Sequence, residues 1–113
     1  MTRDYNLLFK DIVEAIKKID EFIGDMNYAK FAKDDKTSSA VARKIEIIGE
    51  AAKNIPAQLR RKHPQIPWSD MAKMRDKTIH FYFGVDNEIV WKVCKDRLPA
   101  IRLLIEQILK ESK

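Results

Sequence analysis

The feature that most constrains this chain is the spacing of its apolar residues, which recur every three to four positions along most of its length. Glycine and proline, which interrupt helices, number only 3 and 4 in 113 residues. No stretch alternates apolar and polar residues for long enough to predict a strand. We therefore predict an all-α fold, an up-and-down bundle of four to five helices.

The apolar stripes place the first two helices of this bundle. The first stripe covers residues 8–23 and should end near Gly24, because glycine is a common helix terminator. The polar residues that follow leave room for one short turn, and "DDKTSSA" (residues 34–40) is predicted to be a loop with capping residues. The second helix is expected over residues 40–54, with Gly49 in its middle.

Prolines and capping residues divide the second half of the chain. Residues 56–68 contain three prolines and should form a short helical piece and an extended connection. A third helix is predicted to start near Trp68–Asp70 and to run towards Phe83, with Gly84 as its stop. Asp86 can cap a fourth helix, which Pro99 should kink or restart.

Length and composition bound the class of protein. A chain of 113 residues suits one domain, residues 1–113, and a domain this small favours a homodimer. The net charge of +5 makes an anionic partner such as nucleic acid plausible. The sequence has neither a long apolar span nor a signal peptide, and Cys94 is its only cysteine. We expect a cytoplasmic protein that does not enter membranes and has no internal disulfide.

Three polar residues in "RDKTIHFYF", Arg75, His80 and Tyr82, are the candidates for chemistry. In a regular helix Arg75 and Tyr82 would share a face, whereas His80 would lie about 140° from Arg75. A second copy of the chain could bring both to one atom, which favours a dimeric site. Arginine and histidine suit RNA cleavage, because the ribose 2′-OH is an internal nucleophile, histidine moves its proton and arginine holds the phosphate. No metal or cofactor is needed.

Each of these residues also has a purely structural interpretation. The spacing Arg-x4-His is common, and a histidine at a helix end is often a surface or cap residue. Tyr82 lies between Phe81 and Phe83, so its ring could equally be packing.

Several charged residues elsewhere could support such a site. Lys73 and Lys77 flank Arg75, and Arg60 and Arg61 belong to the basic cluster "RRKH"; all four could contact RNA phosphates, although "RRKH" could equally be a solvated helix end. Arg43 and Glu46 are three apart and should pair, or orient the arginine or histidine of the third helix. Glu46 and Glu50 have the spacing of two metal ligands, but no third ligand lies near, so we predict no metal site.

The segment "MRDKTIHFYFGVDNEIVWKVCKDRLPAI" resembles the HepT-like proteins of the HEPN superfamily, whose signature is Arg, four to six residues, His, any residue, Tyr. "AVARKIEIIGEAAKNIP" and "IPW" resemble further blocks of the same family, in the same order. The similarity covers almost the whole chain, and its weakest part is residues 25–39.

The resemblance implies an all-α homodimer that is the toxin of a type VII toxin–antitoxin pair. It implies a metal-independent ribonuclease with Arg75 and His80 as its catalytic pair, in a cleft at the dimer interface. It also implies that a small MNT-type nucleotidyltransferase neutralises the toxin by transferring AMP from ATP to Tyr82. Such an addition would bring bulk and negative charge close to His80.

Two other functions remain open on the sequence alone. The chain could be a non-catalytic accessory subunit that presents substrates to a nucleotidyltransferase. It could also be a helical DNA-binding protein, although no helix-turn-helix spacing marks a base-reading helix. RNA cleavage that requires His80 would separate the first interpretation from both.

Overall fold

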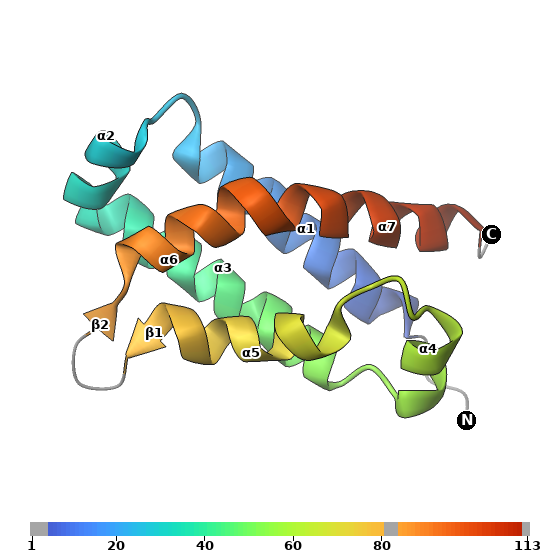
Figure 1. Cartoon of the computed structure of the whole chain (residues 1–113). Helices are drawn as coiled ribbons and strands as arrows, with labels where there is room; N and C mark the ends of the chain where they lie inside the picture. Colours follow the sequence, from blue (N-terminus) through green and yellow to red (C-terminus); the bar gives the residue numbers. More distant parts are fainter. Residues whose placement is uncertain (1–4, 81–83, 112–113) are drawn as a thin grey trace.

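The computed structural model describes residues 5–80 and 84–111, and helices dominate it (Figure 1). Its two strands have two residues each and form one antiparallel pair. The elements in the described residues are α1 (Asn6–Ile23), α2 (Tyr28–Lys33), α3 (Asp35–Lys53), α4 (Ala57–Lys62), α5 (Trp68–Thr78), β1 (Ile79–His80), β2 (Gly84–Val85), α6 (Asn87–Lys92), a π-helical segment (Val93–Arg97) and α7 (Leu98–Glu111).

The longer helices run up and down. In Figure 1 the chain passes along α1, back along α3, out along α5 and back along the rod formed by α6, the π segment and α7. The short helices α2 and α4 lie at the connections from α1 to α3 and from α3 to α5. This arrangement confirms the predicted all-α class. None of the described helices is both long and apolar enough to span a membrane.

Local capping signals explain where these helices begin and end. Gly24 ends α1 with φ +51°, a left-handed conformation that glycine adopts at little cost. Asn27 and Asp34 cap α2 and α3: Asn27 Oδ1 accepts from the backbone N–H of Lys30 at 2.9 Å, and Asp34 Oδ1 accepts from that of Thr37 at 3.0 Å.

The loop predicted over residues 34–40 is wrong, because α3 already begins at Asp35. Only Asp34, its capping residue, keeps the predicted role. The hydroxyl of Ser38 donates to the carbonyl of Asp35 at 3.2 Å, and Ser38 is buried. Serine and threonine are tolerated in a first turn because their hydroxyls bond to the nearby backbone there.

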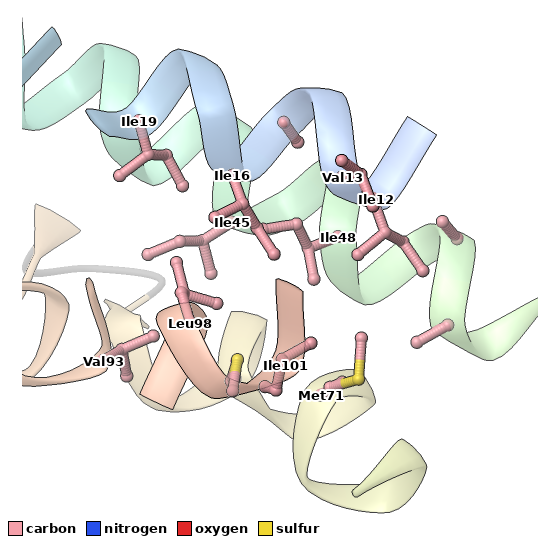
Figure 2. Close-up of a cluster of buried hydrophobic side chains, with 14 of the residues drawn as sticks. Ile12, Val13, Ile16, Ile19, Ile45, Ile48, Met71, Val93, Leu98 and Ile101 are labelled. Carbon is pink, nitrogen blue, oxygen red and sulfur yellow. The ribbon is translucent and has the colours of Figure 1, made fainter. Parts of the chain in front are cut away.

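The core forms where α1 and α3 pack together and are covered by α5 and the α6–α7 rod. Figure 2 shows Ile16 of α1, Ile45 and Ile48 of α3, and Leu98 at the start of α7 pointing toward one another. None of these four side chains is more than 1% exposed. The apolar stripes read from the sequence therefore form the core.

Pro99 lies where the fourth helix restarts, as predicted: α6 ends at Lys92, a π-helical segment follows, and α7 begins at Leu98, one residue before the proline. Asp86 caps α6 as predicted, with Oδ1 accepting from the backbone N–H of Ile89 at 3.2 Å. Proline cannot donate the usual helical hydrogen bond, and its ring crowds the carbonyl four residues earlier. The wider π segment Val93–Arg97 lies directly before this position and accommodates the proline without breaking the rod.

Candidate functional site

The segment that carries the candidate residues leaves the helix earlier than predicted. Helix α5 ends at Thr78, and Ile79 and His80 form β1, which pairs with β2 in the register Ile79↔Val85 and His80↔Gly84. The predicted helix to Phe83, with Gly84 as its stop, is therefore wrong. Thr78 and Ile79 are β-branched and aromatic residues follow, so this stretch favours extended backbone over helix.

This chain reversal changes the relation between the candidate residues. Arg75 lies in the last turn of α5 and His80 in β1, so the angle of about 140° expected for one regular helix does not apply. The structure describes the backbone of Arg75, Lys77 and His80, and their side chains lie outside the described part. Tyr82 lies outside the described residues altogether. We refer to Arg75–Val85 as the motif segment.

Helices α3 and α6 lie beside the motif segment. Helix α5 packs along α3, strand β2 also contacts α3, and α5 contacts α6. Figure 1 shows α3 and α5 side by side and antiparallel, which places the N-terminal half of α3 alongside the C-terminal half of α5. Arg43 and Glu46 lie near the middle of α3.

Arg43 and Glu46 form the predicted pair. Arg43 Nη1 donates to Glu46 Oε2 at 2.9 Å. The side chain of Arg43 is 67% exposed and that of Glu46 is 31% exposed. The pairing is confirmed, and the second expectation, that these residues orient the arginine or histidine of α5, stays a prediction.

The basic residues predicted to contact RNA lie at two different places. Lys73 is exposed on α5, two residues before Arg75. Arg60 and Arg61 lie on α4, and Figure 1 shows α4 and β1 at opposite ends of α5. The 11 residues of α5 span about 16 Å, so one chain does not bring α4 to the motif segment. Contacts from Arg60 and Arg61 would require a long RNA or a second copy.

An aromatic cluster joins α2 to α6, just after the motif segment. The Trp91 ring lies 5.2 Å from that of Phe31 and 5.9 Å from that of Tyr28, measured between centroids. Lys95 Nζ lies 4.9 Å from the Trp91 centroid, and Asn87 Nδ2 donates to the carbonyl of Ala32 at 3.5 Å. This cluster was not predicted from the sequence. The four-residue spacing of Trp91 and Lys95 was a signal for one contact, but nothing indicated that α2 packs there.

Two further features lie apart from the motif segment. In the described part of the chain, no three His, Cys, Asp or Glu residues are placed to hold a metal ion. A hollow of about 770 Å³ lies between α1 and α7. Its lining includes Lys10, Lys17, Leu103 and Glu106 but no residue of α5 or of the motif segment.

Comparison with known proteins gives one consistent result. The family described as "Ribonuclease HepT-like" matches residues 12–108. A protein of Thermococcus cleftensis with the name "Probable ribonuclease HepT" is 47% identical over 97% of this chain and 100% of its own length. A candidate RNase of Methanocaldococcus jannaschii is 44% identical over 96% of this chain and 90% of its own. A candidate RNase of Caldanaerobacter subterraneus is 37% identical over 90% of this chain and 91% of its own. No solved structure matches significantly.

Proposed function

This chain belongs to the HepT-like ribonuclease family, and from that membership we propose that it is a ribonuclease that cleaves RNA without a metal ion, with Arg75 and His80 as its catalytic pair. The observation that carries the proposal is the complete Arg-x4-His-x-Tyr motif inside a family match over residues 12–108. The end of α5 supports it, because β1 and β2 hold His80 at a chain reversal rather than inside a helix.

The chemistry follows from the two side chains and the ribose. The imidazole of His80 takes the proton of the 2′-OH, and the 2′ oxygen forms a bond to phosphorus. The bond from phosphorus to the 5′ oxygen breaks, and this oxygen leaves with the electron pair and receives the proton from the imidazolium. The products are a 2′,3′-cyclic phosphate and a 5′-OH. The guanidinium of Arg75 binds the phosphate oxygens, whose charge increases in the transition state.

We propose that the cleft for this reaction forms between two copies of the chain. The motif segment lies at one end of the bundle, and its strand pair contacts α3 but is only two residues long. A second copy can supply the remaining wall and further basic groups. Sedimentation velocity should find a dimer, and a monomer that cleaves RNA at full rate would contradict this part of the proposal.

We propose that the enzyme is inhibited by modification of Tyr82, two residues after His80. In this proposal the chain is the toxin of a type VII toxin–antitoxin pair, and an MNT-type nucleotidyltransferase antitoxin transfers AMP from ATP to the tyrosine hydroxyl and releases pyrophosphate. Each AMP adds bulk and a negative phosphodiester beside the catalytic histidine, which would repel an RNA backbone. The net charge of +5 would help attract an acidic antitoxin.

The central experiment measures cleavage of total cellular RNA in EDTA. The unmodified wild-type protein should cut, and Arg75→Ala and His80→Ala should each lose at least a hundredfold in rate. His63→Gln is the matched control, because His63 is the only other histidine and lies next to α4, at the other end of α5. Equal cleavage by wild type and His80→Ala would overturn the site.

A second experiment separates silencing from inactivity. Co-expression with the neighbouring nucleotidyltransferase should raise the intact mass by whole AMP units and abolish cleavage. Tyr82→Phe should prevent both effects. An unmodified wild-type protein that cuts no RNA would favour the accessory-subunit interpretation instead.

A further inference from the structure

A partly exposed aromatic surface lies where α2 meets α6, with Tyr28 exposed and Trp91 half-buried. We define the Tyr28–Trp91 surface as Tyr28, Trp91 and Lys95. Tyr28 is 37% exposed, although a large ring gains free energy from burial, and its ring meets that of Trp91 edge to face at an interplanar angle of 66°. Phe31, fully buried, supports Trp91 from the core. The rings are therefore held in place before any ligand binds.

The Tyr28–Trp91 surface lies close to the motif segment along the chain. His80 pairs with Gly84, β2 leads into α6 within two residues, and Trp91 follows Asn87 by about one helical turn. These steps limit the distance between the Cα atoms of His80 and Trp91 to roughly 21 Å. A few nucleotides of extended single strand span that distance.

We propose that an unpaired base of the RNA substrate stacks on the ring of Tyr28, which Trp91 holds edge to face, while Lys95 contacts the adjacent phosphate, so that the substrate class is single-stranded RNA. This inference rests on the proposed function and adds a substrate-binding site to it. Aromatic side chains are the usual stacking platforms for splayed bases. In a duplex both faces of each base are already stacked, so a duplex cannot use such a surface.

Exposed lysines surround the aromatic rings and add phosphate contacts to the stacking. Lys30 and Lys33 of α2 are exposed, as are Lys92 of α6 and Lys95 of the π segment. The exposed acidic residues of the same elements are Glu88 and Asp96, so positive charge is in excess. Binding here should therefore tolerate any base sequence and should weaken as the salt concentration rises.

The test measures binding separately from cleavage. The substitution His80→Ala keeps the RNA intact during the measurement. Trp68→Phe removes the only other tryptophan, which is buried, so that all tryptophan fluorescence comes from Trp91. Single-stranded RNA oligonucleotides should quench Trp91 fluorescence. Tyr28→Ala should weaken their binding roughly 5- to 100-fold, and Tyr28→Phe, which keeps the ring, should bind nearly as well as the parent.

Two exposed residues of the α1–α7 hollow provide matched controls. Leu103→Ala removes a 69% exposed apolar side chain, and Lys17→Ala removes an exposed lysine that corresponds to Lys95→Ala. Both controls should bind RNA as the parent does, whereas Lys95→Ala should bind more weakly. An equal loss in Lys17→Ala and Lys95→Ala would contradict a specific contact at Lys95.

The remaining outcomes distinguish this proposal from the proposed function. Cleavage by the wild type without Trp91 quenching would overturn the stacking site alone. Quenching by single strands without any cleavage by the wild type would support the site and overturn the ribonuclease proposal. Equal binding of duplex RNA would overturn the substrate class, and conversion of a dimer to a monomer by Tyr28→Ala would show that this surface is a subunit contact.

Discussion

Asp70 in the first turn of α5 and Arg97 at the end of the π segment form an ion pair, with Arg97 Nη1 at 3.3 Å from Asp70 Oδ2. The two residues are 27 positions apart. The pair joins the start of α5 to the α6–α7 rod, whereas the end of α5 carries the motif segment. It is thus a link between two elements that flank the candidate site.

Asp70→Asn should lower the free energy of unfolding by about 1 kcal/mol or less, because both side chains are near half exposed and water screens the pair. Urea unfolding followed by circular dichroism measures this change. The control is Glu21→Gln, which breaks the exposed Lys18–Glu21 pair within α1. It should lower the free energy of unfolding by about the same small amount as Asp70→Asn. A loss above roughly 2 kcal/mol for Asp70→Asn alone would mean that the link is buried in solution.

Ile45 should be among the residues least tolerant of truncation, since its side chain is 0% exposed and meets those of α1 and α7 (Figure 2). Ile45→Ala should cost about 2–5 kcal/mol and Ile45→Val about 0.5–1.5 kcal/mol, because a larger cavity loses more packing. Thermal and urea unfolding measure both. Leu103→Ala, at a 69% exposed position, should change stability by no more than about 0.5 kcal/mol.

The cap of α3 should make stability depend on acid. The hydrogen bonds from Thr37 hold the pKa of Asp34 below its ordinary value of 3.8. The unfolded chain therefore binds the proton more readily, so the stabilisation is complete above pH 3.8 and decreases as the pH falls through the lower, folded-state pKa. Melting temperatures measured from pH 6 to pH 2 should fall less for Asp34→Asn, which still caps but does not titrate. Identical acid profiles would contradict this role.

Cys94 should be unreactive until the chain unfolds. Burial raises the pKa of its thiol to about 12, so the native protein holds almost no thiolate near neutral pH. A thiol reagent at pH 8 should label native protein at the slow rate of unfolding and label urea-unfolded protein at once. Rapid labelling of the native state would show that the helix around Cys94 opens easily.

Lys73, which is exposed on α5, should contribute more to RNA binding than the arginines on α4. Lys73→Ala should weaken binding of single-stranded RNA and reduce the slope of log K against log salt by about 0.7, the value for one lost phosphate contact. Arg61→Ala is the matched comparison, because Arg61 is also exposed but lies at the far end of α5. Equal effects would indicate a binding surface that extends along the whole helix.

Local patterns in the sequence predict most of the helices and the core. Apolar residues at helical spacing, such as Ile12, Ile16, Ile45 and Ile48, identify buried faces because a helix repeats every 3.6 residues. Gly24 and Asp86 mark helix ends through bonds and angles set by neighbouring residues. The motif that carries the proposed catalysis is also local in sequence, so family membership could be recognised without a structure.

The tertiary structure was needed to show how distant segments meet. It ended α5 at Thr78, because pairing of His80 with Gly84 offers the backbone hydrogen bonds that a longer helix would have made. It also placed Tyr28 against Trp91 and Asp70 beside Arg97. These contacts join residues far apart in the chain, and their energies depend on packing that no local spacing encodes.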